Sequence, residues 1–147
     1  MSDKSINQIQ EEIIKEFSIL GDDMESTIFY IMELGNKLEP LEEQYKIESN
    51  LIKGCQSKVW LKADMKDHNL FLKADSNTDI TKGLISLLIR TLSTQPLDEI
   101  IHADLYFIDK IGMQKVIGSQ RSNGLISMIK QIKLYALAYK TKLQNQT

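Results

Sequence analysis

Two short runs of alternating apolar and polar residues lie near the middle of the chain. Within residues 57–63, Val59, Leu61 and Ala63 alternate with Lys58, Trp60 and Lys62, and residues 70–74 repeat the alternation after a polar link at 64–69. Such a pair predicts an antiparallel β-hairpin. Because a hairpin alone is marginally stable, helices must cover it or a third strand must extend it, and residues 47–52 give a weak signal for one. We therefore predict an α+β fold, with a small antiparallel β-sheet of two to three strands packed with several helices, in a single domain over residues 1–147.

Helical periodicity surrounds the predicted hairpin. Apolar residues recur at three- and four-residue spacing in residues 5–20 and, after the candidate cap Asp23, as far as residue 38. The turn-forming residues 75–79 predict the start of a broadly apolar helix over 80–92. Further along, the patterns predict a short helix from Pro96, another over 104–111, a polar loop with two glycines over 118–124, and a last helix over about 123–143. Residues 41–53 are interpreted as an irregular connector.

The composition excludes several classes of protein. The net charge of −2 in 147 residues argues against a nucleic-acid binder. One cysteine cannot form an internal disulfide, and one cysteine with two histidines argues against a metal or cluster site. No apolar run is long enough to span a bilayer, and the polar N-terminus shows no signal peptide. We expect a cytoplasmic protein with no membrane contact, no metal and no cofactor.

The only cysteine, Cys55, follows Gly54 and precedes the first alternating run. A glycine here allows a tight or left-handed backbone and leaves the thiol uncrowded, so the cysteine is predicted on a loop that leads into a strand. Thiol exchange through a sulfur–sulfur intermediate is the simplest reaction of a lone thiol. Without a second cysteine the chain cannot resolve such an adduct, which favours a carrier over a dithiol oxidoreductase. A buried, inert cysteine is the alternative that the composition leaves open.

Three other side chains are candidates for a role beside the thiol. His68, in the predicted hairpin turn, and His102, at the end of a short helix, are the only candidate bases for a cysteine hydrolase, and no spacing places either near Cys55. Arg121 lies in the predicted glycine-flanked loop, where a cation can lower a thiol pKa or bind a partner's carboxylate. Asp75 is interpreted as a turn or cap residue.

Four stretches of the sequence carry a family resemblance. One of them, residues 54–61, holds the cysteine in the pattern Gly-Cys-Gln-Ser-Lys-Val-Trp-Leu. The others are residues 30–35, residues 75–76 followed by 82–85, and residues 121–125. Taken in chain order, and spread over nearly the whole chain, the four stretches resemble the SufE family of sulfur acceptors, which act with cysteine desulfurases in iron–sulfur cluster assembly.

The resemblance implies a function and a site. Cys55 would accept the sulfane sulfur of a desulfurase persulfide and carry it as a persulfide. Gly54, Gln56 and Ser57 would shape the acceptor loop, which the free protein tucks inward, and Arg121 would stabilise that loop or engage the desulfurase. The implied partners are a SufS-like cysteine desulfurase, which the chain would activate, and a downstream iron–sulfur scaffold complex. The protein would be an accessory in sulfur transfer rather than a stand-alone enzyme.

Other classes of function stay open at this point. A scaffold that assembles the cluster itself is disfavoured, because clusters are usually held by several thiolates. A single-Cys thiol enzyme would need a base beside Cys55. A non-catalytic interaction domain would contain an inert cysteine. The sequence leaves open whether the chain forms a homodimer.

Overall fold

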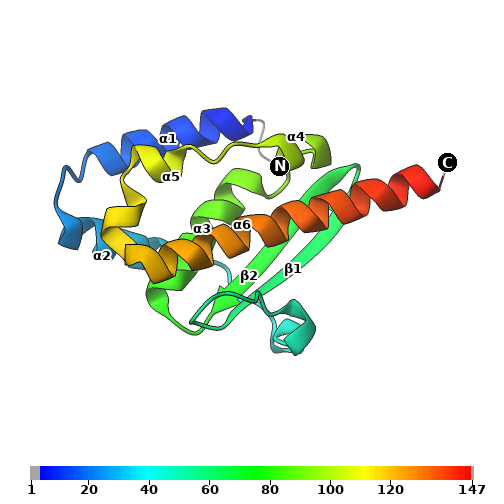
Figure 1. Ribbon diagram of the computed structural model, residues 1–147, viewed down its shortest axis with the longest axis horizontal. Helices are drawn as coiled ribbons and strands as arrows, with labels where there is room; N and C mark the ends of the chain where they lie inside the picture. Colours follow the sequence, from blue (N-terminus) through cyan, green and yellow to red (C-terminus); the bar gives the residue numbers. More distant parts are fainter. Residues whose placement is uncertain (1–3, 147) are drawn as a thin grey trace.

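The computed structural model describes residues 4–146 and has an α+β fold (Figure 1), which confirms the predicted class. A two-stranded β-hairpin lies between two N-terminal helices and four later ones. In chain order the elements are α1 (Ile6–Ser18), α2 (Met24–Asn36), the 3-10 helices η1 (Glu43–Tyr45) and η2 (Glu48–Asn50), β1 (Val59–Lys66), β2 (Asn69–Ser76), α3 (Asp79–Leu92), α4 (Leu97–His102), α5 (Phe107–Lys110) and α6 (Met113–Asn145).

Capping side chains begin the first two helices. The Ser5 hydroxyl accepts a hydrogen bond from the Gln8 backbone N–H, and the Gln8 side chain accepts one from the Ser5 N–H, which forms a capping box. Asp23 caps α2 by accepting the backbone N–H of Glu25. Both helices end two residues before the predicted positions, so these two predictions are confirmed.

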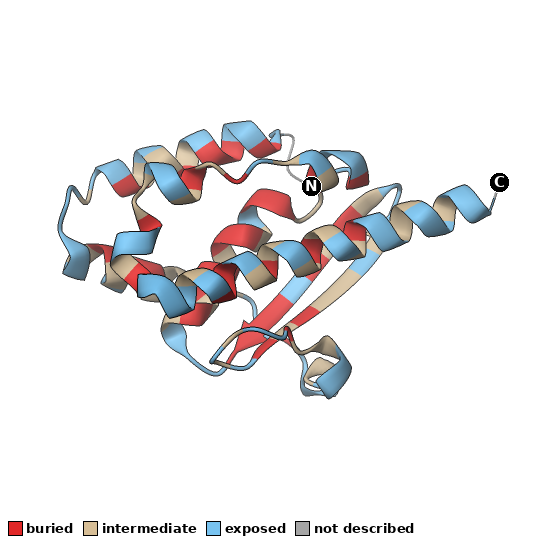
Figure 2. Ribbon diagram, in the orientation of Figure 1, coloured by how far each residue is buried: buried red, intermediate tan, exposed pale blue. Residues whose placement is uncertain are grey.

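The helix α3 forms the centre of the core. It contacts α1, α2, α6 and β2, and much of its ribbon is coloured as buried in Figure 2. Helix α2 crosses it closely at Gly83, where a Cβ would clash with the carbonyl oxygen of Ile31. The prediction that residues 80–92 form a broadly buried helix is therefore confirmed.

The hairpin is longer and its turn tighter than the sequence predicts. Strands β1 and β2 pair antiparallel with Trp60 opposite Asp75. Asp67 and His68 form the turn with φ values of 54° and 68°, the positive values that two-residue hairpin turns require. The polar turn predicted over residues 64–69 is confirmed at its centre but its bounds are too wide, because the polar residues at its two ends belong to the exposed end of the strands.

The weak signal for a third strand over residues 47–52 is also wrong. This segment forms the 3-10 helix η2, and only a single bridge, between Leu51 and Trp60, joins it to the sheet. The connector therefore contacts β1 at one point and does not extend the sheet. That point lies directly before the loop that carries the cysteine.

Both outer edges of the hairpin form hydrogen bonds with other parts of the chain. The Tyr139 hydroxyl, from α6, donates a 3.0 Å hydrogen bond to the Ala63 carbonyl on the free edge of β1. On the free edge of β2, the Leu70 N–H donates to the Gln95 carbonyl. The bridge at Leu51 covers the other end of β1.

The long helix α6 crosses the front of the molecule in Figure 1 and has one break. Gly118 has φ 80° and ψ 171°, a conformation that is essentially restricted to glycine. The predicted loop over residues 118–124 is wrong except at this glycine, since the residues that follow are helical. None of the helices in residues 4–146 combines the length and apolar character needed to cross a membrane.

Candidate functional site

Hydrogen bonds hold both ends of residues 53–58, here called the Cys loop, which lead into β1. The Ile52 N–H donates a 2.9 Å hydrogen bond to the Val59 carbonyl, which closes the base of the loop. On the other side, the Lys58 N–H donates to the Asn77 side chain at 3.0 Å, and the Asn77 N–H donates back to the Lys58 carbonyl at 3.2 Å. The predicted loop placement of the cysteine, ahead of a strand, is confirmed.

Small residues let the Cys loop lie directly against α6. Gly54 has a φ of 94°, and a Cβ at this position would lie 2.5 Å from the Ser127 hydroxyl oxygen. One residue further on, the Cys55 Sγ lies 3.5 Å from the Gly124 carbonyl oxygen, to which it donates a hydrogen bond. The roles of Gly124 and Ser127 escaped the sequence analysis, although two small residues three apart on one helical face are a signal for such an approach.

A small cavity of about 60 Å³ opens beside the thiol. A cavity needs about 10–15 Å³ on this measure to hold one water molecule, so there is room for another heavy atom bonded to the sulfur. Its lining brings together the predicted residues Cys55, Gln56, Ser57 and Arg121 with the unpredicted Thr81, Leu84, Gln120, Gly124 and Met128.

The environment of Cys55 favours the neutral thiol. The residue is half-buried, and burial raises the pKa of its thiol above the ordinary value because a thiolate loses solvation there. Its only hydrogen-bond partner in residues 4–146 is a carbonyl oxygen, which accepts from a thiol and offers nothing to a thiolate. The lowered pKa that a nearby arginine can produce is not found here.

Ser57 ties the Cys loop to the start of α3. Its hydroxyl oxygen lies 2.9 Å from the Thr78 hydroxyl and 3.3 Å from the Thr81 hydroxyl, both of which donate to it. Thr81 is buried, whereas Gln56 is exposed. Of the predicted loop residues, Ser57 therefore anchors the loop and Gln56 forms part of its outer surface.

Arg121 lies in the helical turn after the break at Gly118, rather than in an open loop. Its side chain is exposed and lines the cavity beside Cys55. Within residues 4–146 no carboxylate forms an ion pair with it. The predicted proximity of this arginine to the cysteine is therefore present, with the guanidinium available to a partner.

The two histidines lie elsewhere. His68 is in the hairpin turn, and His102 ends α4 with its Nδ1 2.8 Å from the Asp98 carbonyl oxygen. Neither lines the cavity of Cys55, and no Asp or Glu among the described residues lines it. A base for a cysteine hydrolase is therefore missing from the described surroundings of the thiol. Across the same part of the chain, no group of three His, Cys, Asp or Glu side chains is placed to hold a metal ion.

Asp75 has a larger structural role than the predicted turn or cap. Its buried carboxylate accepts the Leu41 N–H and forms ion pairs with Lys46 at 3.3 Å and Lys82 at 3.5 Å. Burial by itself raises the pKa of Asp75, but its hydrogen bonds with Ser76, Lys46 and Leu41 and the charge of Lys82 outweigh burial and hold the pKa below the ordinary value. The carboxylate thus joins the connector, β2 and α3 behind the Cys loop.

Comparisons with known proteins agree with this geometry. Residues 11–136 match the family model described as "SufE: Fe-S metabolism associated domain". The chain is 38% identical over 128 residues to an uncharacterised SufE-like protein of Rhizobium etli, and the aligned residues cover 84% of this chain and 86% of that protein. It is 35% identical over 122 residues to the cysteine desulfuration protein SufE of Wigglesworthia glossinidia brevipalpis, and here the aligned residues cover 82% of this chain and 84% of that protein.

A longer relative and a solved structure complete the comparison. SufE-like protein 1 of Arabidopsis thaliana, described as chloroplastic/mitochondrial, is 35% identical over 136 residues, which are 90% of this chain but only 36% of that protein. The solution structure of a hypothetical protein from Thermus thermophilus superposes with a TM-score of 0.73 at 16% identity and covers 90% of this chain and 96% of that one. At that identity the structural likeness bears on the fold alone.

Proposed function

The chain belongs to the SufE family, and on this premise we propose that it accepts sulfur on Cys55 from a cysteine desulfurase and delivers it for iron–sulfur cluster assembly. Family membership supports a sulfur-transfer role linked to iron–sulfur metabolism. The observation that carries the finer proposal is the lone thiol of Cys55 beside a cavity of about 60 Å³. Sulfur added to this thiol is sheltered there by Leu84 and Met128.

The proposed step is a thiol exchange. The Cys55 sulfur, as thiolate, attacks the outer sulfur of the persulfide on the desulfurase's own cysteine. The bond between the two sulfurs of the desulfurase persulfide breaks, the enzyme leaves as a thiolate that takes up the proton lost from Cys55, and Cys55 becomes a persulfide. One sulfur–sulfur bond replaces another, so no external oxidant or reductant is needed.

The proposal requires the Cys loop to move when the desulfurase binds. At rest Cys55 is half-buried, and this burial raises the pKa of its thiol and so favours the protonated form, which protects it from oxidation. Gly54 allows the backbone to pivot, and Gln56 and Arg121 are exposed where a partner meets the loop. Movement away from α6 exposes the sulfur to solvent and lowers the pKa of its thiol, which activates it.

Delivery to a scaffold and activation of the desulfurase follow from the same exchange. Once the sulfur has moved to Cys55, the desulfurase is free for another turnover, and the carried sulfur can pass to a thiol of a downstream scaffold complex. The chain acts here as an accessory protein, and the chemistry that releases sulfur from cysteine belongs to the desulfurase.

The test is mass spectrometry of the intact protein after incubation with a cysteine desulfurase from the same genome and free cysteine, without reductant. We expect a gain of at least one sulfur atom that a thiol reductant removes and that the Cys55→Ser variant does not show. A desulfurase that is active and binds the chain, yet adds no sulfur to it, would contradict the proposal.

The remaining alternative is an interaction domain with an inert cysteine. The raised pKa of Cys55 is the observation in its favour. It predicts that iodoacetamide reacts slowly with Cys55 both alone and in the presence of the desulfurase. The carrier proposal predicts slow reaction alone and faster reaction when the desulfurase, with its own cysteine replaced, is bound.

A further inference from the structure

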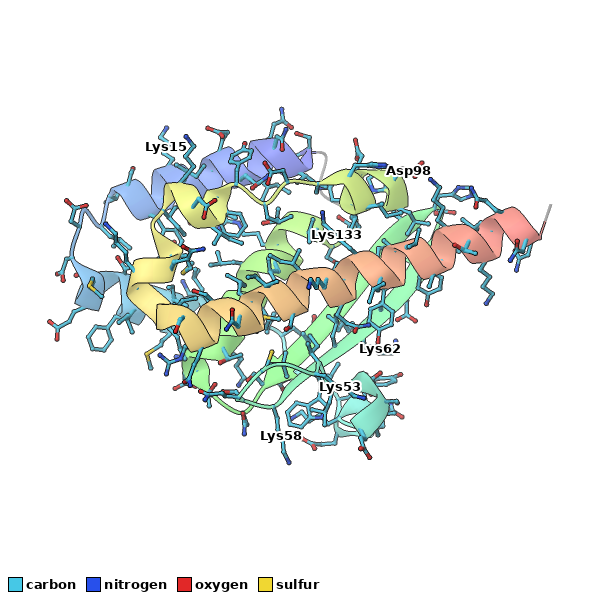
Figure 3. The ribbon with its side chains drawn as sticks, in the orientation of Figure 1. Lys15, Lys53, Lys58, Lys62, Asp98 and Lys133 are labelled. Carbon is cyan, nitrogen blue, oxygen red and sulfur yellow. The ribbon has the colours of Figure 1, made fainter. Side chains whose placement is uncertain are left out.

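Cations gather around the Cys loop without acidic partners. Lys53, Lys58, Arg121 and Lys130 are all exposed, and within residues 4–146 none of them forms an ion pair. Figure 3 shows Lys53 and Lys58 along the lower edge of the molecule, where the loop runs. Helix α6, which supplies the other two, holds six lysine and arginine residues and no aspartate or glutamate.

An open groove of about 830 Å³ lies between η2, the Cys loop and α6. Lys53 and Lys130 line it, and Glu48 is the single carboxylate in its described lining. Leu134 also lines the groove although it is 57% exposed. Ser127, against which the Cys loop lies, is part of the same wall, so the groove is continuous with the loop that carries the thiol.

We infer that this groove docks an acidic segment of the cysteine desulfurase while Cys55 receives sulfur, an inference that rests on the proposed function. Carboxylates of the segment pair with Lys53 and Lys130, and an apolar side chain covers Leu134. Because neither lysine has an acidic partner among the described residues, docking breaks no ion pair there.

The shape and charge of the groove favour a protein segment over other polyanions. A concave groove accepts a chain that enters it, whereas a lipid surface is too flat to reach its floor. The net charge of the whole chain is −2, so long-range attraction for nucleic acid is absent, whereas a local group of cations steers the encounter with a local group of carboxylates.

The test compares the affinity of wild type and of variants for the cysteine desulfurase from the same genome. The double variant Lys53→Glu/Lys130→Glu is expected to weaken binding by about tenfold or more, because two attractions become repulsions. Glu48→Lys, which removes the repelling carboxylate, is expected to tighten it. Raising the salt concentration should weaken wild-type binding more than that of the double variant.

A matched control places the same charge change on the far side of the molecule. Lys15 and Lys110, on α1 and α5, are exposed and form no ion pair within residues 4–146, and Lys15→Glu/Lys110→Glu should bind within about twofold of wild type. Circular dichroism checks that every variant is folded.

The outcomes separate this inference from the proposed function. If wild type gains sulfur but the groove variant binds the desulfurase as well as wild type does, the groove inference is overturned and the proposed function stands. Equal weakening by the groove variant and the control also overturns the inference, because net charge alone then explains the effect. If the lysines matter only for wild-type binding to vesicles that contain phosphatidylserine, the groove serves a membrane and the inference fails. If wild type neither binds the desulfurase nor gains sulfur, both proposals fail.

Discussion

The sulfur of Cys55 lies 3.4 Å from the point where a side chain on Gly124 would begin. A Cβ there would only touch the sulfur, at an ordinary van der Waals distance, and the thiol rests against the backbone of α6 with its hydrogen bond to the Gly124 carbonyl oxygen. The Cys loop at rest is therefore bonded to a backbone carbonyl that lies 69 residues further along the chain.

A side chain at position 124 should displace the Cys loop. Gly124→Val adds two methyl groups to a Cβ that would itself already touch the sulfur, and overpacking of this kind costs about 1–3 kcal/mol. That free energy shifts the equilibrium toward an open loop by roughly fivefold or more. The measurement is the rate of iodoacetamide alkylation of Cys55 in the native protein, which should rise by a similar factor.

Ala138→Val is the control for that experiment, because Ala138 is exposed on the same helix. It should leave the alkylation rate unchanged. An unchanged rate in Gly124→Val itself would mean that the contact between α6 and the thiol does not hold the loop in place.

The thiol of Cys55 should titrate at a higher pH in the folded protein than in the unfolded one. Burial raises its pKa, and urea removes the burial. The alkylation rate measured against pH gives the midpoint in each state, and the native midpoint should be the higher. A native midpoint below the unfolded one would show that a cation such as Arg121 controls the thiol instead.

Replacement of Asp75 by asparagine should destabilise the fold. The buried carboxylate holds Lys46, Lys82 and the Leu41 N–H, and hydrogen bonds to a charged group contribute about 1.5–3 kcal/mol. We expect the free energy of unfolding, measured in urea, to fall by about 2 kcal/mol in Asp75→Asn. A change below about 0.5 kcal/mol, typical of a surface position, would contradict this role.

The same carboxylate predicts a pH dependence. The pKa of Asp75 in the folded protein lies below its ordinary value, so the ionised group stabilises the fold at all pH values above the pKa of the unfolded group. This contribution is lost as the pH falls through the lowered folded pKa. Wild-type stability should therefore fall steeply below about pH 4, and Asp75→Asn should show a shallower fall.

The hairpin turn should accept a glycine. His68 has a φ of 68°, a left-handed conformation that costs an L-residue about 1–2 kcal/mol, part of which the flexibility of glycine in the unfolded chain offsets. His68→Gly is expected to raise the free energy of unfolding by about 0.5 kcal/mol and to leave sulfur uptake by Cys55 unchanged. Loss of sulfur uptake in this folded variant would instead assign the histidine a chemical role.

The helices and the hairpin could be predicted because burial imposes a period on the sequence. The stripe of α1 and the alternation in β1 each face the core, so apolar residues had to recur there. Where the hairpin extends beyond the core that demand disappears, and Asp64 and Lys66 occupy a strand whose sequence is typical of a turn. The limits of β1 and β2 were therefore missed although their presence was not.

Glycines near Arg121 show why the site was only partly predicted. Gly118 breaks a helix, whereas Gly124 stays inside one and lies against the sulfur atom of Cys55. The sequence does not distinguish the two positions. Only the fold brings residue 124 to residue 55, so the cysteine could be singled out in advance but its contact on α6 could not.

The hydrogen bonds on both edges of the hairpin also bear on aggregation. A two-stranded sheet normally presents two templates on which strands of other chains can add and begin aggregation. Here Tyr139 bonds the Ala63 carbonyl on one side, and Gln95 accepts the Leu70 N–H on the other. Under the proposed function the chain offers its Cys loop to a desulfurase, and these contacts reduce the chance that a strand edge is offered with it.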